Sequence, residues 1–152
     1  PMANARRIDA MEGFVNDAKQ RGGRIVTGGN RRGNQGYFFE PTVITDVPDD
    51  SKVMTVEPFG PVAPILAFKS FDEVVERANS LPYGLAAYAF TSSAQTATMI
   101  ADALQSGMVG VNSIAVSTPE TPFGGVKESG YGSEGGIEGL AAYLNTKFIS
   151  QA

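Results

Sequence analysis

The clearest periodicity in the chain lies in residues 61–112, PVAPILAFKSFDEVVERANSLPYGLAAYAFTSSAQTATMIADALQSGMVGVN. Three apolar runs in this stretch predict short strands, over residues 62–68, 85–90 and 108–111. The first two runs are each followed by a capping box that predicts a helix: Ser70-x-x-Glu73 and Ser92-x-x-Gln95. Strands that alternate with helices are typical of parallel pairing with right-handed crossovers. The predicted fold class is therefore α/β, with an open, largely parallel sheet and flanking helices.

Upstream of this stretch, the pattern predicts one long amphipathic helix, over residues 4–21. Its apolar face consists of Ile8, Met11, Val15 and Ala18, and glycines follow where a left-handed residue would end the helix. Short strands are expected next, over residues 24–27, 37–39 and 42–44, with an exposed glycine-rich turn after the first of them.

Downstream of Asn112, the sequence loses its periodicity for about 25 residues that are rich in Gly and Pro. A loop of that length is uncommon in a compact domain unless it has a function. Beyond it, a short helix is predicted over residues 137–143 and a terminal strand over residues 146–150. Functional side chains are therefore expected in the loop.

The composition excludes several classes of function. A net charge of −4 argues against a surface for nucleic acid, because such surfaces need clustered Lys and Arg. No apolar run approaches the roughly 20 residues of a membrane span and no secretion leader opens the chain, so a cytoplasmic protein without a membrane partner is expected. The absence of Cys and His excludes disulfides, Cys nucleophiles, Ser-His-Asp triads and ordinary zinc sites built from this chain alone.

The motif Glu57-Pro58-Phe59-Gly60-Pro61 holds a carboxylate and an aromatic ring on a segment stiffened by two prolines. A carboxylate in such a place can accept two hydrogen bonds from a ribose diol, and a ring can pack against a flat heterocycle. On the residues alone, a rigid turn into the next strand explains the motif at least as well.

Features of the glycine-rich loop also have plain structural explanations when each is taken alone. The glycines from Gly130 to Gly135 match the dinucleotide fingerprint only formally, because they do not follow the first strand of a βαβ unit and no acidic residue follows at the required spacing. Phe123 is explained as an anchor of the loop in the core, and Ser117 and Glu134 are explained as solvent-facing side chains.

Four motifs taken together resemble the aldehyde dehydrogenase superfamily in order and spacing: residues 57–61, 81–85, 107–112 and 122–130. The resemblance covers essentially the whole chain and is closest to succinate-semialdehyde-type members. It implies the C-terminal part of the catalytic domain over residues 1–144 and a terminal oligomerisation strand over residues 145–152. In this family a Cys attacks the aldehyde, hydride passes to NAD or NADP, and a Glu activates the hydrolytic water. Both residues lie upstream of the matched part, so the resemblance implies an enzyme fragment that is inactive alone.

The resemblance also assigns roles to residues that support the reaction. Glu57 is expected to hold the nicotinamide ribose of NAD or NADP, and Phe59 is expected to position the nicotinamide ring. Ser117, five residues after Asn112, matches the Ser that binds the distal carboxylate in relatives acting on succinate semialdehyde. A semialdehyde of a dicarboxylic acid is therefore the preferred small-molecule substrate, with Phe123 lining the aldehyde tunnel.

Further assignments by resemblance hold for only some members of the family. Glu134 matches a carboxylate of a proton-relay path, although Ser133 stands where the family often has Arg. The backbone oxygens of Lys127 and Gly130 match a monovalent-cation site. Residues 146–150 resemble a strand that pairs with another subunit, which predicts a homo-oligomer. The alternative is a natural noncatalytic module of the same fold, with an oligomerisation or regulatory role.

Overall fold

In the computed structural model, which describes residues 1–152, helix α1 (Ala5–Gln20) opens the fold. The side-chain oxygen of Asn4 caps it by accepting a hydrogen bond from the backbone N–H of Arg7 at 3.3 Å. The helix ends at Arg21, and Gly22 follows with a left-handed φ of 91°. The predicted helix is confirmed to within one residue at each end.

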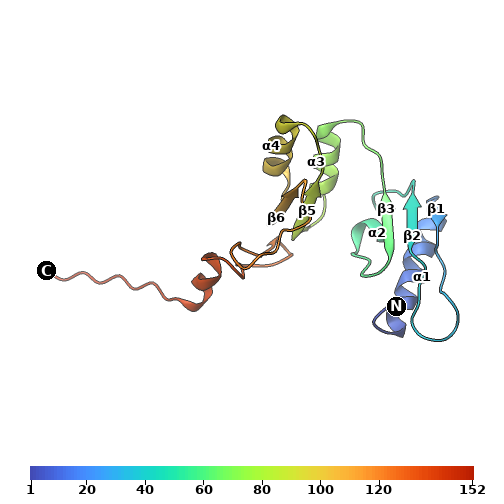
Figure 1. Ribbon diagram of the computed structural model, residues 1–152, viewed down its shortest axis with the longest axis horizontal. Helices are drawn as coiled ribbons and strands as arrows, with labels where there is room; N and C mark the ends of the chain where they lie inside the picture. The colour runs from blue at the N-terminus through green and yellow to red at the C-terminus, as the bar shows by residue number, and fades with distance from the viewer. The chain divides into compact units, whose positions relative to one another are not determined.

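The first of two compact units, Pro1–Ala67, combines α1 with a three-stranded sheet (Figure 1). Its strands are β1 (Arg24–Thr27), β2 (Thr42–Thr45) and β3 (Val62–Ile65). β1 and β2 are antiparallel, whereas β2 and β3 are parallel and are connected through the short helix α2 (Lys52–Thr55). The core between these elements is apolar and consists of Ile8, Met11, Phe14, Val15, Ala18, Phe39, Ile44, Val47, Val53 and Val62.

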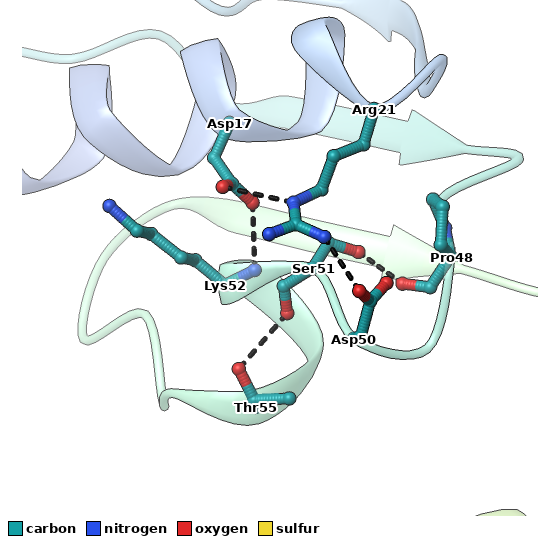
Figure 2. A network of polar contacts seen from close by, with 7 residues as sticks. All are labelled: Asp17, Arg21, Pro48, Asp50, Ser51, Lys52 and Thr55. Atoms are coloured by element: carbon teal, nitrogen blue, oxygen red, sulfur yellow. Dashed lines mark hydrogen bonds and ion pairs between the residues drawn. The ribbon is translucent and has the colours of Figure 1, made fainter.

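A polar network joins the end of α1 to the start of α2 (Figure 2). The Asp17 carboxylate accepts a hydrogen bond from the backbone N–H of Lys52 at 2.8 Å and pairs with Arg21 at 3.1 Å. Arg21 also pairs with Asp50 at 2.7 Å. The hydrogen bond from Lys52, together with the neighbouring Arg21, holds the pKa of Asp17 below its ordinary value. Asp17 is therefore an ionised link between two elements that are far apart in sequence.

Substitution of Asp17 by Asn is expected to lower the free energy of unfolding at pH 7. Because the folded-state pKa is depressed, the carboxylate stabilises the fold above the unfolded-state pKa of about 3.9, and this stabilisation disappears as the pH falls through the folded-state pKa. The urea concentration at the unfolding midpoint should be lower for Asp17→Asn than for the unsubstituted protein at pH 7, and the two values should converge below pH 4. The exposed Asp9 of the same helix provides the control, Asp9→Asn. Equal midpoints for the Asp17 variant and the unsubstituted protein at pH 7 would contradict this role.

The second unit, Phe68–Ala152, contains two small sheets. Its elements are α3 (Phe71–Asn79), β4 (Tyr83–Gly84), β5 (Ala86–Ala89), α4 (Ala94–Ala103), β6 (Met108–Val111), β7 (Val126–Lys127) and the 3-10 helix η1 (Glu138–Tyr143). β5 and β6 pair in parallel with α4 in their connection, and β4 pairs antiparallel with β7. The two parallel strand pairs of the protein confirm the predicted α/β class.

The helix caps of the second unit agree with the sequence at one helix and differ at the other. The Ser70 hydroxyl accepts a hydrogen bond from the backbone N–H of Glu73 at 3.2 Å, which confirms Ser70 as the predicted cap, whereas the Glu73 carboxylate accepts the N–H of Lys69 at 2.8 Å. The second helix is capped by Ser93, which accepts from the N–H of Thr96 at 3.2 Å. The prediction of Ser92 is wrong by one residue, because α4 begins at Ala94 and the capping hydroxyl must immediately precede the helix.

The structure also corrects the predicted short strands. No strand forms over residues 37–39, where Phe39 makes only an isolated bridge with Arg31. Residues 146–150 form no strand within the chain, so their pairing with another subunit stays a prediction. The predicted strands over residues 62–68 and 85–90 are shorter than expected. Helix α2 was not predicted, since its four residues are too few to establish a periodicity.

Hydrophobic burial differs between the two units. The first unit contains the whole core cluster, whereas Ile100 and Met108 are the buried hydrophobic side chains of the second. Many large apolar side chains of the second unit are exposed, among them Ile114, Tyr131, Ile137, Tyr143 and Phe148. The second unit therefore buries little apolar surface by itself. No helix in the structure has the length and apolar character needed to cross a membrane.

Candidate functional site

The turn before β3 presents Glu57 and Phe59 to solvent. Both side chains are exposed, and 69% of the Phe59 surface is accessible. The turn itself is held from behind, because the guanidinium of Arg7 on α1 donates two hydrogen bonds to the Phe59 carbonyl oxygen, at 3.1 and 3.3 Å. A carboxylate and an aromatic ring on an anchored turn form a surface that a ribose and a flat heterocycle can contact.

Close packing beneath the turn limits its movement. A Cβ atom on Gly60 would collide with the sulfur of Met11, a core residue of α1. The Pro61 carbonyl accepts the backbone N–H of Thr42 on β2 at 2.8 Å. The exposed pair of side chains therefore lies on a segment that is fixed on its inner side, as expected for a preformed binding surface.

Asn112 closes the end of β6, where the glycine-rich loop begins. It adopts a left-handed φ of 54°, which Asn tolerates better than most residues. Its side-chain oxygen accepts the N–H of Thr91 at 2.9 Å, and its side-chain amide donates to the Thr91 carbonyl at 2.9 Å. The sequence identified Asn112 only as the start of the loop, and its pairing with Thr91 is not detectable from local pattern.

Within the loop, the hydroxyl-bearing residues differ in their contacts. Thr118 and Thr121 bond to each other, with 3.2 Å between their hydroxyl oxygens and a 3.2 Å bond from the Thr121 N–H to the Thr118 carbonyl. Ser117 is exposed, and its hydroxyl makes no hydrogen bond within the chain. Of these three hydroxyls, that of Ser117 is the one available to a ligand.

The structure brings two of the predicted site residues together. Phe123 and Glu134 exchange a pair of backbone hydrogen bonds, each 2.7 Å long, in an isolated antiparallel bridge. The Phe123 side chain is half-buried, which agrees in part with the interpretation as a loop anchor, and Glu134 is exposed. Glu134 also lines an open groove with Leu140 and Tyr143 of η1.

Lys127 acts in the structure through its side chain. Its ammonium nitrogen donates to the backbone carbonyls of Asn79 at 2.9 Å and Leu81 at 3.0 Å. The sequence assigned only its backbone oxygen, with that of Gly130, to a monovalent-cation site, and that assignment stays a prediction. No group of three or more His, Cys, Asp or Glu side chains could hold a metal ion. The lysine contacts were missed because they span more than 40 residues of sequence.

Comparison with protein families agrees with the predicted resemblance. A family model described as the aldehyde dehydrogenase family matches residues 1–149. The chain therefore belongs to the aldehyde dehydrogenase family. Its α/β fold is that of aldehyde dehydrogenase catalytic-domain chains, which confirms the predicted fold class.

Known relatives match the chain along nearly its whole length. It is 47% identical over 149 residues to 4-(hydroxymethyl)benzenesulfonate dehydrogenase of Comamonas testosteroni, covering 98% of this chain and 31% of the relative. Identity is 45% with a probable NADP⁺ succinate-semialdehyde dehydrogenase of Sinorhizobium fredii, with 98% and 30% covered. The solved succinate-semialdehyde dehydrogenase of Burkholderia pseudomallei superposes with a TM-score of 0.89 at 42% identity, with 94% and 30% covered. The chain thus spans about 30% of the length of these relatives.

Proposed function

We propose that this chain is part of an NAD(P)-dependent aldehyde dehydrogenase that oxidises an aldehyde with a distal anionic group to a carboxylate. The observation that carries the proposal is the family match together with the outward-facing pair Glu57 and Phe59 on a turn anchored by Arg7. Glu57 would accept hydrogen bonds from the nicotinamide ribose hydroxyls, and Phe59 would limit the orientations of the ring. The bound cofactor supplies the hydride acceptor of the reaction.

The chain contributes to the reaction without supplying its nucleophile. It contains no Cys, so we assign the thiolate that attacks the aldehyde to another part of the protein, and by the family resemblance we assign the Glu that activates water there too. The exposed apolar side chains of the second unit and the 30% coverage of the relatives support this division of roles. The chain alone is therefore expected to be inactive, and we place it in a cytoplasmic homo-oligomer that pairs through residues 145–152.

The preferred substrate is a semialdehyde of a dicarboxylic acid. The available hydroxyl of Ser117 can donate a hydrogen bond to a carboxylate oxygen. Several relatives are named for substrates with an anionic group: succinate-semialdehyde dehydrogenases, and a 3-sulfolactaldehyde dehydrogenase of Pseudomonas putida that is 42% identical. An aldehyde whose far end carries a carboxylate or sulfonate fits this pattern, and the carboxylate is the one we favour.

Four further residues of the glycine-rich stretch receive supporting roles. Phe123 would form part of the wall of the aldehyde tunnel, and its backbone bridge to Glu134 would tie that wall to the proton-relay carboxylate. The backbone oxygens of Lys127 and Gly130 would contribute to a monovalent-cation site. In this proposal these residues bind, position or relay a proton, and the nucleophile and the water-activating Glu belong to another part of the protein.

The proposed reaction is tested with the full-length protein that contains this chain. Purified protein is mixed with NAD or NADP and a panel of aldehydes, including succinate semialdehyde and an uncharged aldehyde of similar length, and formation of reduced cofactor is followed by absorbance. We expect a higher kcat/KM for the anionic aldehyde. Absence of cofactor reduction with every aldehyde and both cofactors would refute the proposal, and turnover by the isolated chain would refute its expected inactivity.

Ser117→Ala tests the substrate class. Removing one hydrogen bond to a charged group costs about 1.5 kcal/mol or more, so KM for succinate semialdehyde should rise by roughly tenfold. The KM for the uncharged aldehyde should change by less than about twofold, since it has no carboxylate for the hydroxyl to bind. Ser92→Ala, an exposed serine outside the loop, is the control. An equal change for both aldehydes would exclude Ser117 as the recognition residue.

A further inference from the structure

The Lys127 ammonium occupies the C-terminal end of helix α3. Asn79 is the last residue of α3, and its carbonyl is one of the two that Lys127 binds. Carbonyl groups at the end of a helix lack partners within the helix and carry partial negative charge. The lysine therefore caps α3 from a position 48 residues away in sequence.

Backbone contacts on either side of Lys127 fix the same segment. Lys127 pairs with Tyr83 in the antiparallel β4–β7 ladder, and the Glu128 N–H donates to the Pro82 carbonyl at 2.9 Å. The Ser129 hydroxyl accepts the N–H of Gly84 at 2.9 Å. Lys127 adopts a φ of 55°, an unfavourable conformation for a non-glycine residue that persists only where surrounding contacts hold it.

The side chain of Asn79 extends this connection to the other helix of the unit. Its amide donates to the Ala103 carbonyl at 2.9 Å, and its oxygen accepts the N–H of Gln105 at 2.8 Å. Residues 103–105 form the end of α4 and the connection to β6. Asn79 therefore connects the ammonium of Lys127 to residues 103–105, which lead into β6. The loop of residues 113–125 begins just after that strand.

The loop of residues 113–125 is thus held at both of its ends. At its start, Asn112 is bound to the backbone of Thr91, and at its end β7 is bound through Lys127 to the end of α3. β7 is only two residues long, so its ladder alone provides few hydrogen bonds. The ammonium contributes two further bonds, one to the carbonyl of Asn79, the last residue of α3, and one to the carbonyl of Leu81, in the connection from α3 to β4.

We propose that Lys127 is a positioning residue for the loop of residues 113–125, and through that loop for Ser117 and Phe123. Without the ammonium, β7 would separate more readily from the end of α3, and the downstream end of the loop would move with it. The effect on substrate rests on the function proposed above, whereas the effect on loop order does not depend on it. The two effects are therefore measured separately.

Hydrogen exchange in the full-length protein measures the effect on loop order. Lys127→Met removes the charge and the donors while keeping a similar chain length. The amides of Thr121 and Phe123, which are hydrogen-bonded in the structure, should exchange at least about tenfold faster in this variant. Amides in the α1 core, such as that of Val15, should exchange at an unchanged rate. Lys69→Met, at an exposed lysine of the same unit, is the matched control.

Steady-state kinetics measure the effect on substrate. Lys127→Met should raise KM for the anionic aldehyde by about tenfold, while kcat stays within about threefold and KM for NAD(P) is unchanged. A merely structural role would reduce the fraction of active protein, which lowers kcat and leaves KM unaltered. Lys127→Arg, which keeps a charged donor, should recover most of the lost affinity.

The outcomes of these experiments test the positioning role of Lys127 and the proposed function separately. Faster loop exchange with a raised aldehyde KM supports both, and faster exchange in a protein that oxidises no aldehyde supports the positioning role and refutes the proposed function. Unchanged exchange in a folded Lys127→Met protein refutes the positioning role. Should that variant fail to fold, Lys127→Gln and Lys127→Arg replace it. Slower loop exchange in the Arg variant than in the Gln variant supports the positioning role, and equal exchange rates in the two variants refute it.

Discussion

Gly107→Ala is expected to lower the free energy of unfolding by about 3 kcal/mol, the upper part of the range for inserting a methyl group into a packed site. A Cβ atom on Gly107 would collide with the carbonyl oxygen of Gly124 and lie 3.1 Å from the Cα of Gly125. Both neighbours are backbone atoms, so no side chain can rotate away. The segment that precedes β7 would have to shift from the start of β6.

Urea unfolding of the full-length protein measures this effect, with Gly13→Ala as the matched control. Gly13 lies inside α1 with no atom within 4 Å of an added Cβ, so alanine there should raise stability by about 0.5–1 kcal/mol. The two glycine substitutions should therefore change stability in opposite directions. A Gly107→Ala protein as stable as the unsubstituted one would show that the backbone at Gly124 is free to move.

Glu57→Gln is expected to reduce kcat/KM for the cofactor by roughly 10- to 100-fold in the full-length protein. A carboxylate that accepts two ribose hydrogen bonds loses its charge in this variant, and a hydrogen bond to a charged group contributes about 1 kcal/mol more than a neutral one, so about 2 kcal/mol is lost over the two bonds. Each 1.36 kcal/mol corresponds to a factor of ten in rate. The anchored turn should keep its shape, because Arg7 holds it through the Phe59 backbone.

Initial rates at varied NAD and NADP concentrations test this prediction. Asp9→Asn, at an exposed carboxylate on α1, controls for the loss of one negative charge on the same unit. The melting temperature of the Glu57 variant should equal that of the unsubstituted protein, since the Glu57 side chain is exposed. An unchanged kcat/KM for NAD and NADP would show that Glu57 does not bind the cofactor.

The elements of residues 61–112 could be predicted because their signals are local. Apolar runs of strand length and the pair Ser70 and Glu73 lie within a few residues of each other, and the structure confirms a strand, shorter than predicted, and a helix capped by Ser70. The errors arose where the local signal is ambiguous. Ser92 and Ser93 are adjacent and equally able to cap, and only the geometry of α4 selects Ser93. An aromatic run at residues 37–39 has strand propensity but no neighbouring strand with which to pair.

For the candidate site, the sequence likewise indicated the residues but not the contacts that hold them. Glu57, Phe59, Ser117 and Phe123 lie in motifs whose order and spacing indicate the family from sequence alone. The contacts that support these residues cannot be predicted from local sequence, because Arg7 and Phe59 are 52 residues apart in sequence and Lys127 and Asn79 are 48 apart. No local pattern distinguishes these two basic residues from others on the surface.

By itself, the sequence determined the α/β class, the long first helix, the family and the motifs that carry the candidate site residues. These follow from periodicity and residue type, which act over one or two turns of helix or a few residues of strand. Only the tertiary structure decided which side chains hold the motifs in place, how the strands are distributed between two units, and that the apolar core belongs to the first of them. The reason is physical: a hydrogen bond or a packed contact depends on distance in space, and the chain brings together residues whose separation in sequence carries no information about that distance.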